Sequence, residues 1–62
     1  MNESSFQFDL GQGVMRLADS KIGSINGRAD YVRQEPQYNF QYQNSHGDLE
    51  YVWLPASELS AL

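Results

Sequence analysis

Strict alternation of aromatic and amide side chains is the clearest pattern in this 62-residue chain. The two kinds interleave over residues 38–43, where Tyr38, Phe40 and Tyr42 are separated by Asn39, Gln41 and Gln43. Side chains on a strand point to opposite faces with a period of two, so this segment predicts a strand with one aromatic and one amide face. A polar, glycine-containing segment (residues 44–48) leads to a second apolar run (residues 49–54), and this order predicts a β-hairpin.

Shorter patterns precede the hairpin. After a polar and flexible segment (residues 1–5), Phe6, Phe8 and Leu10 alternate with polar residues and predict a first strand or a strand-like arm. Residues 14–17 predict a short strand, and residues 18–21 predict a polar turn.

A long strand is predicted over residues 22–32. Its alternation places Ile25, Ala29 and Tyr31 on one face, with Gly27 between them. Glycine inside a strand often marks a bulge or a close backbone approach. A small barrel needs such points to curl its sheet, so Gly27 is a candidate for one of them.

The remaining segments complete a single domain over residues 6–62. Residues 33–37 predict a connection, because Pro36 has no N–H for a ladder. Residues 55–59 predict one helical turn that begins near Pro55, after which Leu59 and Leu62 return to the core. We therefore expect a mainly β fold, a small antiparallel barrel of about five strands with one short helical turn near the C-terminus. This order of elements resembles that of an SH3-like barrel.

Composition narrows the possible functions. The chain has no cysteine, which excludes disulfides and thiolate chemistry. Its net charge is −4, with Arg16, Lys21, Arg28 and Arg33 as its bases, and this balance argues against nucleic acid as a partner. No apolar stretch approaches the roughly 20 residues of a membrane span, and the N-terminus lacks the features of a signal peptide. We expect a complete, soluble protein of the cytoplasm.

Catalytic and metal chemistry find little support. The single histidine, His46, lies two residues before Asp48, but a zinc site needs three or four ligands, and the others are missing from the pattern. No serine has a credible base, and Gly11 and Gly13 open onto a strand rather than a phosphate-binding helix. We expect no enzyme, no cofactor and no metal, with His46 a solvated residue of the hairpin turn.

The candidate interaction surface consists of five residues: Arg28, Asp30, Tyr31, Tyr42 and Trp53. Arg28 and Asp30 share a strand face, where the guanidinium either clamps an acidic or aromatic group or forms a charge pair that fixes the strand; we favour the charge pair. A wider aromatic set forms either the core or a groove for an extended peptide or a methylated ammonium, and we favour the core. The set consists of Tyr31, Tyr38, Tyr42, Tyr51 and Trp53. The groove requires that Tyr31, Tyr42 or Trp53 be substantially exposed.

An uncharged polar run raises the possibility of self-association. Its members are Gln34, Gln37, Asn39, Gln41, Gln43 and Asn44. Such a face is either an ordinary solvated surface, which we favour, or the flank of an edge that pairs with another strand. The lack of charge on this face makes a homo-oligomer a reasonable expectation.

The chain resembles short SH3-like barrel proteins of bacteriophages and prophages over residues 10–60. The matching residues are Gly23, Gly27-Arg28-Ala29-Asp30-Tyr31, Pro36-Gln37-Tyr38, Gln41, Gly47-Asp48, Val52-Trp53-Leu54 and Glu58-Leu59. The resemblance implies a barrel fold and a phage or prophage setting rather than an activity. The resulting hypothesis is a noncatalytic protein-interaction module with an unidentified protein partner. The alternative is a small nucleic-acid-associated barrel, for which the four bases must converge into one stripe beside stacking aromatics.

Overall fold

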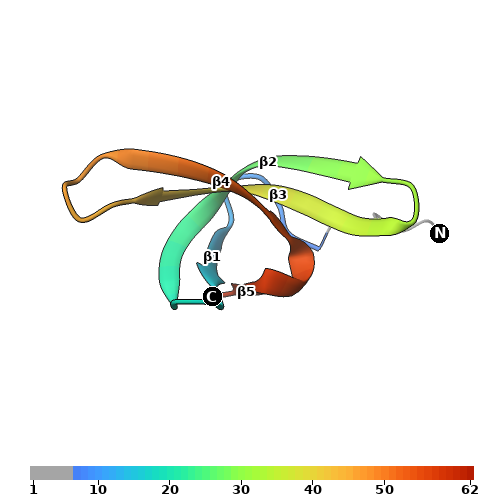
Figure 1. Ribbon diagram of the computed structural model, residues 1–62, viewed down its shortest axis with the longest axis horizontal. Coiled ribbons are helices and arrows are strands. Elements are labelled where there is room, and N and C mark those ends of the chain that lie inside the picture. The colour runs from blue at the N-terminus through green and yellow to red at the C-terminus, as the bar shows by residue number, and fades with distance from the viewer. Residues whose placement is uncertain (1–6) are drawn as a thin grey trace.

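The computed structural model describes residues 7–62 and shows one antiparallel sheet of five strands (Figure 1). The elements are β1 (Gly13–Arg16), β2 (Lys21–Tyr31), β3 (Gln34–Gln43), β4 (Leu49–Pro55), the 3₁₀ turn η1 (Ala56–Glu58) and β5 (Leu59–Ala61). The predicted class, mainly β with about five antiparallel strands and one short helical turn near the C-terminus, is confirmed. The predicted flexible segment (residues 1–5) and Phe6 lie outside the described residues.

The strand order is β4-β3-β2-β1-β5, so β4 and β5 form the two edges of the sheet. The hairpin of β2 and β3 and the hairpin of β3 and β4 extend in opposite directions from a central crossing (Figure 1). The first part of β2 bends away from β3 to pair with β1, which pairs in turn with β5. Within residues 7–62 no pairing joins β4 to β5, and η1 carries the chain from one edge to the other.

The core lies on the aromatic face of β3, as the alternation predicts. Tyr38 and Phe40 are completely buried, and Tyr42 packs partly buried against them. The buried residues come from every strand except β4, together with η1 and the segment before β1: Phe8, Val14, Ile25, Tyr38, Phe40, Ala56 and Leu59. Val52 and Leu54 of β4 pack against this cluster, so one side of a single sheet supplies most of the core.

Residues 7–12 form a turn and an arm across the core, so of the two predicted alternatives, a first strand or a strand-like arm, the strand is not found. The Gln12 N–H donates to the Asp9 carbonyl, and Gly11 adopts a positive φ of 83°, which ends the alternation. Phe8 is buried, whereas Leu10 is 58% exposed, so the two do not share a core-facing side. The tertiary position of Phe8 therefore overrides the local strand pattern.

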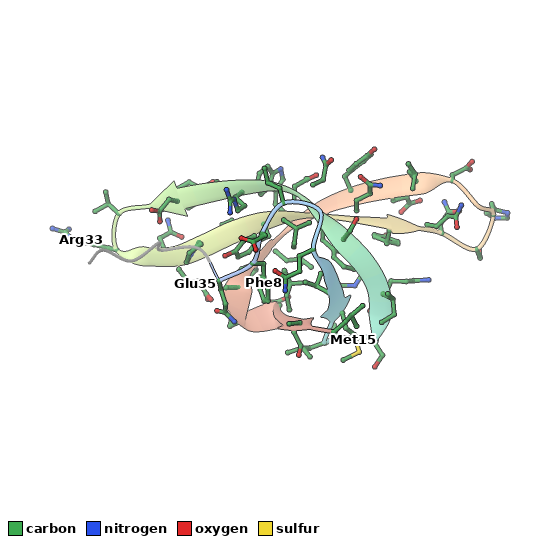
Figure 2. All side chains as sticks on the ribbon, turned by 180° about the vertical axis from the view of Figure 1, so that it is seen from behind. Phe8, Met15, Arg33 and Glu35 are labelled. Atoms are coloured by element: carbon green, nitrogen blue, oxygen red, sulfur yellow. The ribbon has the colours of Figure 1, made fainter. Side chains whose placement is uncertain are left out.

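Phe8 is held by Tyr38. The Phe8 ring meets the Tyr38 ring edge-on, with centroids 5.1 Å apart. The Tyr38 hydroxyl accepts hydrogen bonds from the backbone N–H groups of Gln7 (2.6 Å) and Phe8 (3.2 Å). Arg28 donates from Nη1 to the Phe8 carbonyl at 3.3 Å. Figure 2 shows Phe8 close to the middle of the sheet, where this arm crosses it.

A bulge in β2 confirms the expected irregularity near Gly27 and changes which residues share a face. Ile25 lies opposite Phe40 and Gly27 lies opposite Asn39, so Asn26 is an extra residue in β2. Opposed residues share a face, which places Ile25 with the core and Ala29, opposite Gln37, on the other side. The prediction that Ile25 and Ala29 share a face is wrong, because the extra residue reverses the alternation.

The ends of β3 and of the chain also differ from expectation. The connection between β2 and β3 contains only Val32 and Arg33, and the predicted connecting residue Pro36 lies inside β3. Two residues of β3, Glu35 and Pro36, oppose the single residue 30 of β2, and a bulge is where a strand tolerates the missing N–H of proline. Leu59 is buried as predicted, but Leu62 is 72% exposed.

Gly23 lies where the packing of β2 against β3 leaves no room for a side chain. A Cβ added to Gly23 would lie 2.3 Å from the Gln41 carbonyl oxygen and 2.8 Å from the Phe40 ring. Gly23→Ala is therefore expected to lower the free energy of unfolding by about 3 kcal/mol, at the upper end of overpacking costs. Urea unfolding followed by circular dichroism measures this loss.

Gly27→Ala is the matched control in the same strand. Its added Cβ would meet Asn39 at 3.4 Å and Trp53 at 3.6 Å, which are ordinary contacts. The unfolding free energy of this variant is expected to stay within about 1 kcal/mol of the wild type, since the loss of unfolded-state entropy favours alanine. Equal effects of the two substitutions would contradict the close approach at Gly23.

Candidate interaction surface

The outer face of the sheet carries an apolar strip along β4, opposite to the core. Leu49, Tyr51 and Trp53 occupy alternate positions and are 53%, 54% and 51% exposed. We call these three residues the β4 strip. Each lies beside an amide of β3: Leu49 opposes Gln43, Tyr51 opposes Gln41, and Trp53 opposes Asn39. The amide face predicted for β3 therefore forms one flank of the strip, and we call Asn39, Gln41 and Gln43 the amide row.

At the Trp53 end of the strip, the residues beneath the indole are held in place. The added Cβ used above for Gly27 would lie 3.6 Å from Trp53 Cη2, so the indole covers the bare backbone of β2. Asn39 is only 9% exposed, and its Oδ1 accepts a hydrogen bond from Asn26 Nδ2 at 3.0 Å. The bulge at Asn26 thus supplies the donor that satisfies this buried amide, and the surface around Trp53 is preorganised.

The backbone of the β4 strip points toward the open edge of the sheet. In the hairpin turn the Asn44 N–H donates to the Asp48 carbonyl at 2.8 Å, which makes residues 44 and 48 a hydrogen-bonded pair. Such pairs alternate along an antiparallel ladder with pairs whose N–H and C=O groups face outward. Counting from the turn, the outward groups belong to Leu49, Tyr51 and Trp53. Residue 55 is also an outward-facing position of this alternation, but Pro55 has no N–H, so the row of outward donors ends there.

The five residues predicted as an interaction surface lie in different places. Tyr31 and Trp53 are 47% and 51% exposed, which confirms that at least one ring of the aromatic set is substantially exposed. Tyr42 opposes Glu50, and Arg28 opposes Tyr38, so both lie on the core side of the sheet. Asp30 is exposed near the end of β2. Of the five, Trp53 belongs to the β4 strip.

Leu49 and Tyr51 lie outside the five residues predicted as an interaction surface, although Tyr51 belongs to the aromatic set. The spacing of residues 49, 51 and 53 contains the signal, because three large apolar side chains at alternate positions define one strand face. That spacing does not say whether the face is inside or outside. The pairing of Tyr51 with Gln41, on the amide side of β3, decides it.

A second cluster, on the core side, joins charged groups to Tyr42. The Arg16 guanidinium lies 4.7 Å from the Tyr42 ring centroid and 5.5 Å from that of Phe40. It also donates to both carboxylate oxygens of Asp19, from Nε at 2.9 Å and from Nη2 at 2.8 Å. The Tyr42 hydroxyl donates to Glu50 Oε1 at 2.9 Å.

These contacts shift the ionisation of the groups involved. The hydrogen bonds from Arg16 lower the pKa of Asp19 to about 2, and the same bonds raise the pKa of Arg16. Hydrogen bonds from Asn44 and then Tyr42 lower the pKa of Glu50. The charged groups are bonded within the chain, so the cluster stabilises the end of the sheet where β1, β2 and the β3–β4 hairpin meet.

The basic residues divide between two regions of the sheet. Arg16 and Lys21 oppose each other on β1 and β2, and both lie near the Tyr42 ring. Arg33 lies in the turn at the far end of β2, well separated in Figure 2 from Met15, the neighbour of Arg16. The fourth base, Arg28, lies between these two regions, opposite Tyr38 on the core side of β2.

His46 lies exposed in the hairpin turn, and its backbone N–H donates to Asn44 Oδ1 at 2.8 Å. Over residues 7–62 there is no enclosed pocket and no group of three acidic, histidine or cysteine residues arranged to hold a metal. The described part of the chain also contains no helix long and apolar enough to cross a membrane. Comparison with family models, with characterised proteins and with solved structures gives no match for this chain.

The bond between Arg16 and Asp19 predicts an acid-sensitive contribution to stability. The pKa of Asp19 falls from 3.8 to about 2 on folding, so its stabilisation is complete above about pH 4 and is lost as the pH falls toward 2. Asp19→Asn is expected to give a smaller drop in unfolding free energy between pH 4 and pH 2 than the wild type. Denaturant titrations at a series of pH values measure the difference.

Asp48→Asn, at an exposed aspartate of the β3–β4 turn, is the control. It removes one carboxylate, as Asp19→Asn does, but leaves the guanidinium contact in place. Acid profiles that are the same for both variants would contradict a specific role of Asp19.

Proposed function

We propose that this chain is a noncatalytic protein-interaction module whose contact surface is the β4 strip with the adjoining amide row. The observation that carries the proposal is the half-exposure of Leu49, Tyr51 and Trp53 side by side on a strand at the edge of the sheet. We further propose a phage or prophage origin and a cytoplasmic location. The support for that setting is the resemblance carried by the segment from Gly27 to Tyr31 and the residues that accompany it.

The composition of the surface suits protein recognition. Tyrosine and tryptophan are enriched among the residues that dominate binding energy, because each offers a large rigid ring and a polar group. The neighbouring amide row is uncharged, so covering it requires no desolvation of a formal charge. Its amides both donate and accept hydrogen bonds, which suits a polar rim around an apolar centre.

The free edge adds a second means of binding. The outward N–H and C=O groups of β4 can pair with an extended segment of a partner, while the side chains of the strip contact alternate residues of that segment. Main-chain pairing then provides affinity, and Trp53 and Tyr51 provide selectivity. We infer that the partner presents an extended strand with apolar residues at every second position.

A capture experiment with paired variants tests the proposed surface. The immobilised chain is expected to retain a specific protein from the lysate of its native host, identified by mass spectrometry. The double substitution Tyr51→Ser and Trp53→Ser should reduce that retention at least about tenfold, because hot-spot rings each contribute roughly 2 kcal/mol or more.

Val32→Ser is the control, because Val32 is 83% exposed at the tip of the β2–β3 hairpin and lies outside the strip. It should retain the partner as the wild type does. Equal capture by the double variant and the wild type would contradict the proposed surface. Retention of nucleic acid in place of protein, lost steeply as salt is raised, would instead support the alternative function.

A further inference from the structure

We propose that the partner on the β4 edge is a second copy of this chain, paired antiparallel through β4 with Tyr51 opposite Tyr51 of the other copy. This inference rests on the proposed function, since it names the occupant of the same surface. It follows from three features of β4: which of its backbone groups face outward, where the carboxylate of its one charged residue lies, and the unbroken register of the strand.

The two edges of the sheet differ in their capacity to pair. β5 spans three residues, whereas β4 spans seven and pairs with β3 in unbroken register from Gln37–Pro55 to Gln43–Leu49. Natural edge strands are usually blunted by bulges, by charged side chains or by shortness. The register of β4 contains no bulge, and its length is that of an ordinary internal strand. The long edge is therefore the one suited to a partner.

Glu50, the single charged residue of β4, does not prevent another strand from pairing with this edge. Glu50 Oε1 accepts a hydrogen bond from the Tyr42 hydroxyl at 2.9 Å, and Oε2 accepts one from Asn44 Nδ2 at 2.8 Å. Both donors lie on the β3 side of the hairpin, so the carboxylate is bonded back toward β3 rather than out over the open edge. An incoming strand thus meets backbone groups and the apolar β4 strip.

The backbone phase limits the ways in which two copies can pair. Outward N–H and C=O groups belong to Leu49, Tyr51 and Trp53, so hydrogen-bonded pairs across the two-fold axis can form only among these residues. Centring the pair on Tyr51 places Leu49 opposite Trp53 of the other copy at both ends. This register uses all three residues of each copy and forms about six main-chain hydrogen bonds.

The neighbouring registers are poorer for identifiable reasons. Moving the two-fold axis from Tyr51 to Glu50 places Glu50 directly opposite Glu50 of the other copy, and like charges at that position are unfavourable. Moving the two-fold axis toward Trp53 brings Pro55 into the paired segment, and Pro55 has no N–H to donate. Centring on Tyr51 instead places Glu50 opposite Val52 of the other copy. Apolar groups also oppose each other, because Tyr51 meets Tyr51 and Leu49 meets Trp53.

The size of this contact predicts a weak and reversible dimer. A pair of five-residue segments buries less than the roughly 1,200 Å² of a standard stable interface, so we expect a dissociation constant in the micromolar range or above. The net charge of −4 on each copy opposes association, so the measurement belongs at an ionic strength of about 0.15 M or higher, where this repulsion is screened. Sedimentation equilibrium should show the mass rising from 7.1 kDa toward twice that value as concentration increases.

Charge variants at the two-fold axis test the register. Tyr51→Lys and Tyr51→Glu should each weaken self-association about tenfold or more, because each places like charges in direct opposition. An equimolar mixture of the two variants should associate again, since lysine then opposes glutamate. Val32→Lys and Val32→Glu, at the exposed tip of the β2–β3 hairpin and outside the proposed surface, are the controls and should leave the dissociation constant within about threefold of the wild type.

Hydrogen exchange shows which backbone groups are involved. At concentrations that favour the dimer, the amides of Leu49, Tyr51 and Trp53 should exchange at least about tenfold more slowly than in dilute solution. The expected dimer, restoration by mixed charges and this protection together support the proposal. Association without protection of these amides would mean that the outer faces stack, and the edge-paired dimer would be wrong.

A monomer at all concentrations would overturn the second copy as the occupant while leaving the proposed function standing. In that case the capture experiment with Tyr51→Ser and Trp53→Ser decides whether another protein uses the strip. If the chain dimerises as expected but captures no other protein, self-association is the interaction that the surface serves. Failure of both experiments would overturn the proposed function itself.

Discussion

Burial of the aromatic face of β3 is the constraint on which the rest of this structure depends. Tyr38 and Phe40 are fully enclosed, and rings of this size remove on the order of 150–250 Å² each from water. A sheet of five strands has no second layer to cover that face, so it bends over itself and draws in Phe8 and η1. The Tyr38 hydroxyl is satisfied by the backbone of that same arm, which allows a polar group to occupy the centre of a very small core.

The two faces of β3 therefore meet different requirements. On the inner side, the rings, the Arg16 guanidinium and the Asp19 and Glu50 carboxylates contact one another within the chain. On the outer side, the amide row and the β4 strip are organised by the same ladder but are left half in contact with water. A tryptophan, a tyrosine and a leucine together on an edge strand leave part of the apolar surface available to the partner that we propose.

The alternation of residues 38–43 and the polar turn that follows were sufficient to predict the central hairpin and the core-facing side of β3. The 3₁₀ turn after Pro55 also followed from local signals. For residues 7–12 the local pattern leaves a first strand and a strand-like arm open, and the contacts that Phe8 makes with Tyr38 decide against the strand. The candidate interaction surface could not be predicted fully either. Alternation marks Leu49, Tyr51 and Trp53 as one face, but only the order of the strands makes β4 an edge.

The extra residue at Asn26 has an evolutionary consequence. At this position β2 contains one residue more than the partner strand requires. Loss of the single codon for Asn26 would remove the bulge and leave Arg28 opposite Tyr38 and Ala29 opposite Gln37, so the two sides of β2 would stay as they are. The sheet would lose the amide that satisfies Asn39. A related sequence that is one residue shorter here can therefore keep the facing of β2, but it needs another donor for the buried amide of Asn39.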